Sequence, residues 1–180
     1  MAICNPTGSL SVTIREEIRL PNGNMEQSIN TEVITDVNQI MKRTDTIAPT
    51  FSGSGIEILK FVDSEEQQTA GSFVRDTVKY MRFTNLCSTN FVSLYLIQDS
   101  PEAQNPNNGN VGSGDESLFK LDAGKSMVFS NAQFQGTDYY DYVVEGYVDI
   151  QYFSSFASLS SIKAKADTAN VQIEYFVASS

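Results

Sequence analysis

Apolar and polar side chains alternate along most of this chain with a period of two residues, which is the pattern of β-strands with one buried face. The alternation over residues 10–14 predicts a half-buried strand. It resumes over 18–20 after Glu16–Glu17, which we interpret as a β-bulge. The sequence Pro-Asn-Gly-Asn at 21–24 predicts a turn, so the chain opens with a strand and a reversal of direction.

Further strands are predicted over residues 28–34 and 37–47, with a break at 51–55. The segment 56–63 has apolar side chains on both faces, which favours a central position in a sheet. The next residues, Ser64 to Gln67, have the Ser-x-x-Gln form of a helix capping box. They predict one helical turn.

Three pairs of alternating segments are separated by short turn-rich links, and each pair predicts a β-hairpin. A single strand is also predicted over 147–152. The predicted hairpins are 78–84 with 91–97, 118–121 with 126–129, and 162–166 with 171–177.

Residues 99–117 differ from the rest, because they are rich in Asn, Gly, Ser and Pro and contain almost no apolar side chains. Such a long polar stretch is either a functional loop or a tolerated surface insertion. The chain as a whole, 180 residues, is expected to form one all-β domain over 1–180 with this loop inserted at about 99–117. The predicted fold is a single antiparallel β-sandwich, jelly-roll-like, of about eight to ten short strands.

The formal net charge of −10 argues against two classes of partner. Nucleic acids and anionic membrane surfaces are bound by clusters of Lys and Arg, and the longest basic stretch here is Lys42–Arg43. No apolar run approaches the ~20 residues that span a bilayer, and no signal segment is recognised. The two cysteines, Cys4 and Cys87, are expected to be free thiols of a protein that folds in a reducing cytoplasm.

Histidine is absent, which removes Ser-His-Asp and Cys-His catalysis and the usual zinc sites. The pairs Gly53-x-Gly55 and Gly112-x-Gly114 are too short for a phosphate-binding loop and precede no helix. We therefore expect no catalytic residue, no cofactor and no metal, and we expect that the chain is not an enzyme.

Acidic side chains are frequent between Asp99 and Asp149. This stretch contains nine acids and only two basic residues, Lys120 and Lys125. Two of these acids could act as a glycosidase pair, or a few could hold calcium. A solvated acidic face is the third interpretation, and the sequence leaves all three open.

Tyr139, Tyr140 and Tyr142 lie among acids just after Gly136 and are the candidate contact residues. Tyrosine is favoured in protein interfaces because it buries a large area and keeps a polar group. The alternative is that one or two of these rings complete the core.

Several stretches, in this order and spacing, give the chain a resemblance to small virion proteins of tailed bacteriophages, especially marine and cyanobacterial ones. They are Leu10–Ile14 (LSVTI), Lys79–Leu86 (KYMRFTNL), Ser88–Val92 (STNFV), Leu121–Ser126 (LDAGKS), Ala164–Ala169 (AKADTA) and Phe176–Ser179 (FVAS). The resemblance covers most of the chain outside 99–117.

The resemblance implies a β-sandwich made in the bacterial cytoplasm and carried in the virion, most simply as a capsid decoration or cement subunit. Its partners would be capsid or tail proteins, and its copies would be arranged symmetrically or as a homo-oligomer. Two alternatives remain at this stage. One is a tail-associated adaptor, ring or fibre component, and the other is a glycan-binding module that recognises the host through the polar loop.

Overall fold

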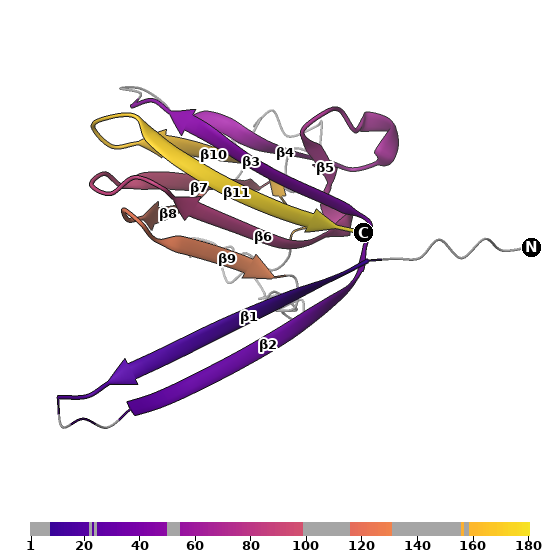
Figure 1. The fold of residues 1–180 in the computed structure, drawn as a ribbon. Coiled ribbons are helices and arrows are strands. Elements are labelled where there is room, and N and C mark those ends of the chain that lie inside the picture. Colours follow the sequence, from indigo (N-terminus) through magenta and orange to yellow (C-terminus); the bar gives the residue numbers. More distant parts are fainter. Residues whose placement is uncertain are drawn as a thin grey trace, which may run out of the picture.

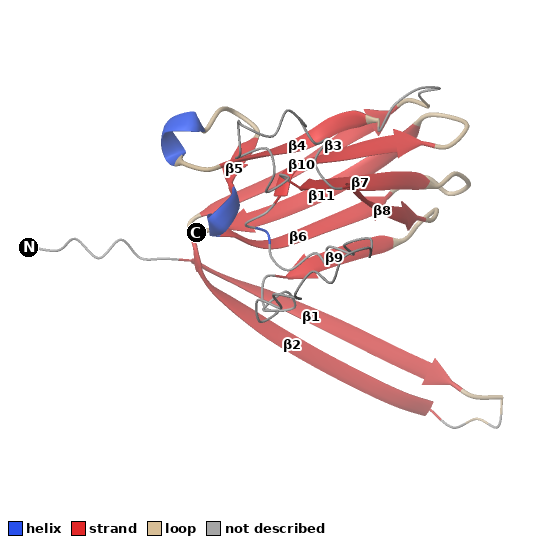
Figure 2. Ribbon diagram, turned by 180° about the vertical axis from the view of Figure 1, so that it is seen from behind, coloured by secondary structure: helices blue, strands red, loops and turns tan. Residues whose placement is uncertain are grey.

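The computed structural model describes residues 8–21, 23, 25–49, 55–98, 116–130, 156 and 159–180. Nearly all of them lie in strands, and Figure 2 shows short 3-10 turns at the end of the sandwich nearest the C-terminus. The all-β prediction is confirmed. The predicted strand at 147–152 lies outside the described residues.

Two sheets pack face to face and form the body of the molecule (Figure 1). The four-stranded sheet has the order β3-β11-β6-β9, and the five-stranded sheet has the order β5-β4-β10-β7-β8. The strands of the first are β3 (Gln39–Ile47), β11 (Val171–Ser179), β6 (Val78–Asn85) and β9 (Ser126–Ser130). Those of the second are β5 (Ser72–Val74), β4 (Ile56–Val62), β10 (Leu159–Ala166), β7 (Val92–Gln98) and β8 (Glu116–Leu121).

The connections give the sandwich its jelly-roll topology. The chain changes sheet between β3 and β4, β5 and β6, β6 and β7, β8 and β9, β9 and β10, and β10 and β11, whereas β4–β5 and β7–β8 stay within one sheet. All pairings between neighbouring strands of the body are antiparallel except that of β4 with the short edge strand β5. The jelly-roll-like prediction is therefore confirmed, and β4 has a neighbour on each side as its two apolar faces predicted.

The three predicted hairpins are wrong in their pairing, although their strands are in the right places. β6 pairs with β11 and β9, whereas β7 pairs with β10 and β8, so the link over 86–91 spans the two sheets. The links β8–β9 and β10–β11 cross in the same way. Alternation shows that each strand buries one face, but it does not distinguish neighbours in one sheet from strands that face each other across a core.

The core fills the space between the sheets with side chains from both. Phe83 on β6 lies 6.1 Å, centroid to centroid, from Phe129 on β9 and 6.3 Å from Tyr175 on β11. Burying each such side chain contributes roughly 1.5–3 kcal/mol. Tyr175 keeps its polar group satisfied, because its hydroxyl donates to a carboxylate oxygen of Asp45 at 2.5 Å. Further members of this core include Ile47, Leu59, Phe73, Leu94, Leu96, Leu159, Ile162 and Ile173.

The predicted capping box is also wrong. Residues Glu65–Gln67 form a single 3-10 turn, and the Ser64 side chain makes no capping hydrogen bond. The following turn is held by Ser72, whose hydroxyl accepts from the Thr69 amide at 2.8 Å and donates to the Thr69 carbonyl at 2.9 Å. The fully exposed first turn lacks buried apolar side chains, so nothing extends it into a longer helix.

The first two strands leave the body as a projecting arm (Figure 1). The arm consists of β1 (Gly8–Arg19) and β2 (Met25–Val37), and among the described residues these strands pair only with each other. The turn between them is closed by the Gly23 amide, which donates to the Leu20 carbonyl at 3.0 Å. The predicted turn is thus confirmed, but the strands are longer than the short ones expected.

The predicted bulge at Glu16–Glu17 is wrong. The pairing runs without a break from Leu10 opposite Ile34 to Arg19 opposite Met25, and the irregularity lies at Gly8–Leu10 instead. Glu16 occupies a regular position on the same face as the apolar residues around it. The polar loop also ends earlier than predicted, since Glu116 and Ser117 belong to β8. Residues 99–115 lie outside the described part of the chain.

Candidate functional site

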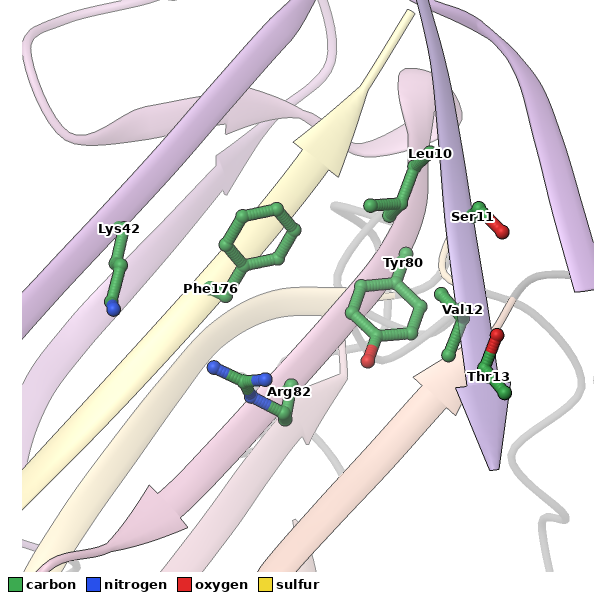
Figure 3. A pocket seen from close by; sticks show the side chains of 8 residues that line it. All are labelled: Leu10, Ser11, Val12, Thr13, Lys42, Tyr80, Arg82 and Phe176. Carbon is green, nitrogen blue, oxygen red and sulfur yellow. The ribbon is translucent and has the colours of Figure 1, made fainter. Parts of the chain in front are cut away.

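The arm is attached to the body by an apolar root. Leu10 and Val12 of β1 point toward Tyr80 (Figure 3), and Ile34 of β2 is buried in the same cluster. This cluster lies on the outer face of the four-stranded sheet, where Ala178 belongs to it and Phe176 and Val128 pack against it.

Two hydrogen bonds to the body also hold the root, one of them to the end of β11. The Asn38 amide, just after β2, donates to the Ser179 carbonyl at 2.9 Å. On the other side, the Ser130 hydroxyl donates to a Glu32 carboxylate oxygen at 3.2 Å. The direction of the arm is therefore set by contacts on both of its strands.

The two faces of the arm expose large apolar side chains that do not belong to the root. Residues directly opposite in an antiparallel pair share a face, so the register assigns every side chain to one of two faces. One face continues the apolar line of the root through Ile14 and Ile18, and the other carries Met25, Ile29 and Val33. Each of these five residues is between 50% and 61% exposed. The contacts that fix the root do not extend to them.

The two faces differ in charge. The face of Ile14 carries Glu16, Glu26 and Glu32 and no basic residue, and we call it the acidic face. The face of Ile29 carries Arg15 and Arg19 with one acid, and we call it the basic face.

The single acid of the basic face, Glu17, lies between its two arginines. It contacts the Arg19 guanidinium at 2.6 Å and that of Arg15 at 3.5 Å. Since the three side chains sit on the exposed arm, these ion pairs add little to stability. They leave one net positive charge on this face.

A cleft of about 360 Å³ lies in the angle between the arm and the body (Figure 3). On the body side, Lys42, Phe176 and Arg82 stand in one cross-strand row, and Leu10 to Thr13 close the other side. Glu174 pairs with both cations, accepting from Lys42 at 3.0 Å and from Arg82 at 2.7 Å. The hydrogen bond from Lys42 holds the pKa of Glu174 below its usual range. Together these three groups leave one net positive charge beside the cleft.

Cys87, in the link between β6 and β7, carries a free thiol. Hydrogen bonds from the backbone at Thr89 and Asn90 lower its pKa to about 7. The Asn90 amide lies 3.5 Å from Sγ.

We expect alkylation of Cys87 by iodoacetamide, in a Cys4→Ser background, to reach half its maximal rate near pH 7. The same chain unfolded in urea is the matched control, and its thiol should titrate near the ordinary value of about 8.5. Equal titration midpoints in the folded and unfolded chains would contradict the hydrogen-bonding pattern of this link.

Tyr139, Tyr140 and Tyr142, the predicted contact residues, lie outside the described residues. Most acids of the region 99–149 lie outside them as well, and the described part of the chain contains no group of three or more acids, cysteines or histidines placed to hold a metal ion. The surface that the structure does present, the distal arm, was missed at the sequence level. The signal was the constant phase of the alternation, because Leu10, Val12, Ile14, Ile18 and Leu20 all lie at even positions although Glu16 interrupts them.

Among the described residues, no helix has the length and hydropathy needed to cross a bilayer. No family model, curated protein or solved structure matches the chain.

Proposed function

We propose that the chain is a structural protein of a tailed-phage virion, specifically a capsid decoration or cement subunit that acts through protein–protein contacts. The observation that carries this proposal is the arm, which projects from the sandwich and exposes five large apolar side chains. An isolated two-stranded ribbon is marginally stable in water, so such an arm is best explained by a partner that covers it.

The mechanism is passive. The sandwich keeps its own core and keeps its shape, while the arm reaches beyond it to a neighbouring subunit. Removing the exposed half of each apolar side chain from water stabilises the contact at about 25 cal/mol per Å². Many symmetric copies of such a contact add up over a shell and oppose the pressure of packaged DNA.

Two further observations support the proposal. The resemblance of the chain to small virion proteins of tailed phages points the same way, and jelly rolls occur among viral capsid domains. Because folds host many functions, the topology alone would not be sufficient. The net charge of −10 favours protein partners over the packaged nucleic acid.

The test compares particles of a phage that encodes this chain with particles that lack it. We expect particles without the chain to release DNA at a lower temperature, and addition of the purified chain to restore the wild-type value. The double variant Ile14→Ser with Ile18→Ser should fail to restore it. Leu118→Ser, which changes an equally exposed apolar residue on β8 of the body, is the matched control and should restore it.

Unchanged thermal stability and unchanged particle density in the absence of the chain would overturn the cement role. The copy number per particle would then distinguish the tail-associated alternative, because a tail ring or fibre follows the symmetry of the tail and not that of the shell.

A second candidate function, glycan binding, is favoured by the cleft at the root of the arm. Its walls combine the rings of Tyr80 and Phe176 with hydroxyl and cationic groups, the mixture that fixes a polar ligand in a small site. Binding of host-surface glycans that is lost in Arg82→Gln, with particle assembly intact, would support this function over the first.

A further inference from the structure

We propose that the arm binds the arm of a second copy of this chain, with the acidic face of one packed on the basic face of the next. This inference rests on the proposed assembly function and names the partner that covers the arm. It also fixes the geometry of the contact as head to tail.

The first support is charge complementarity. The acidic face carries no base and presents the carboxylates of Glu16 and Glu26 beyond the root, where Glu32 bonds to Ser130 of the body. The basic face presents two guanidinium groups against one carboxylate. The chain carries 22 acidic and 12 basic residues, so a basic surface on it is unusual. Opposite charges on the two faces suit stacking of one face on the other and disfavour stacking of two like faces.

The second support is the spacing of the apolar residues. On the acidic face, Ile14 and Ile18 are four residues apart along β1. On the basic face, Met25, Ile29 and Val33 repeat at the same interval along β2. Four residues of a strand span about 13 Å, so the two apolar lines have one period and can interdigitate when two ribbons stack about 10 Å apart.

The third support is that both halves of the contact occur on one arm. A contact between different faces of identical chains is heterologous, so every copy uses its acidic face toward one neighbour and its basic face toward the other. Such a contact closes into a ring if the rotation between copies allows it. A symmetric ring of arms is a means of joining subunits around a symmetry axis of a particle.

The experiment uses two complementary charge reversals in the full chain. One variant reverses the basic face (Arg15→Glu with Arg19→Glu), and the other reverses the acidic face (Glu16→Lys with Glu26→Lys). Self-association is measured by light scattering and sedimentation velocity over a range of concentrations at low salt. Thermal unfolding verifies that each variant keeps its fold.

We expect the wild-type chain to associate, and each variant alone to associate about tenfold more weakly or worse because both of its faces then carry one sign. An equal mixture of the two variants should associate again, since the reversed face of each then meets an opposite charge. Matched controls place the same charge changes on the exposed surface of the body, and they should associate like the wild type. They are Lys60→Glu with Lys125→Glu, and Glu65→Lys with Glu66→Lys.

A wild-type chain that stays monomeric at every concentration would overturn the inference, as would variants that associate normally alone or a mixture that does not associate. Particle binding distinguishes this failure from that of the proposed function. A monomeric chain that still restores the heat stability of particles would leave the cement role intact. A chain that associates through its arms but never joins particles would contradict the cement role alone.

Discussion

Replacing Gly55 by alanine is expected to destabilise the chain by about 4 kcal/mol or more, the range reached when a side chain is forced against fixed backbone. Gly55 immediately precedes β4 and has φ +87°, a conformation that disfavours a Cβ atom. A Cβ at this position would lie 2.3 Å from the carbonyl oxygen of Ala164 on the neighbouring strand β10. The oxygen belongs to the sheet ladder, so relief requires β4 and β10 to separate.

The measurement is the free energy of unfolding from denaturant titration, with Gly71→Ala as the matched control. Gly71 has nearly the same dihedral angle, φ +88°, but its added Cβ would have no atom within 4 Å. The control should therefore lose only about 1–2 kcal/mol, the cost of the left-handed conformation itself. Equal losses at the two positions would mean that the close approach of β4 to β10 is wrong.

Replacing Asn85 by leucine is expected to cost about 3 kcal/mol, because three groups lose their partners in or near the core. Asn85 is the last residue of β6 and is completely buried. Its side-chain amide donates to the carbonyls of Asn90 at 2.9 Å and Leu121 at 3.1 Å, and its side-chain oxygen accepts from the Cys87 amide at 2.9 Å. Leucine has the same number and branching of side-chain heavy atoms and leaves all three unsatisfied.

The same residue ties two of the crossings between the sheets together. Its side chain bonds both ends of the link from β6 to β7 and the end of β8, and its own amide donates to the Lys125 carbonyl in the link to β9 at 2.9 Å. Thr84→Val, on the same strand as Asn85, is the control in the unfolding measurement, since it removes one exposed hydrogen bond to Ser126 on β9. It should cost no more than about 1 kcal/mol. A loss at Asn85 as small as that of the control would contradict its role at the crossings.

The positions of most strands could be predicted from the sequence, because one buried face per strand leaves a clear alternation. This holds for β6, β7, β10 and β11, all of which were placed within a few residues. Their pairing could not be predicted. The decision between a hairpin and a crossing depends on contacts distant in the sequence, such as the bond from Asn85 to Leu121 and the pairing of β10 with β7. The alternation of apolar and polar residues along a strand does not depend on these contacts, so it cannot predict them.

The candidate site was harder to predict than the fold. Ile14 and Ile18 have the pattern of a core-facing strand, and only the structure shows that they lie exposed on an arm that diverges from the body. Opposite charge on the two faces becomes visible only once the register places Arg15 opposite Ile29 and Glu26 opposite Ile18.

Amide hydrogen exchange of the arm, in the free chain at low concentration and in particles that contain it, tests most directly whether the arm is the attachment device. We expect the amides of β1 and β2 beyond the root to exchange rapidly in the free chain, because this part of the ribbon lacks support from the body. In the particle they should be strongly protected, while β6 and β11 should be protected equally in both. Exchange of the arm that is equally rapid in the particle and in the free chain would contradict the account.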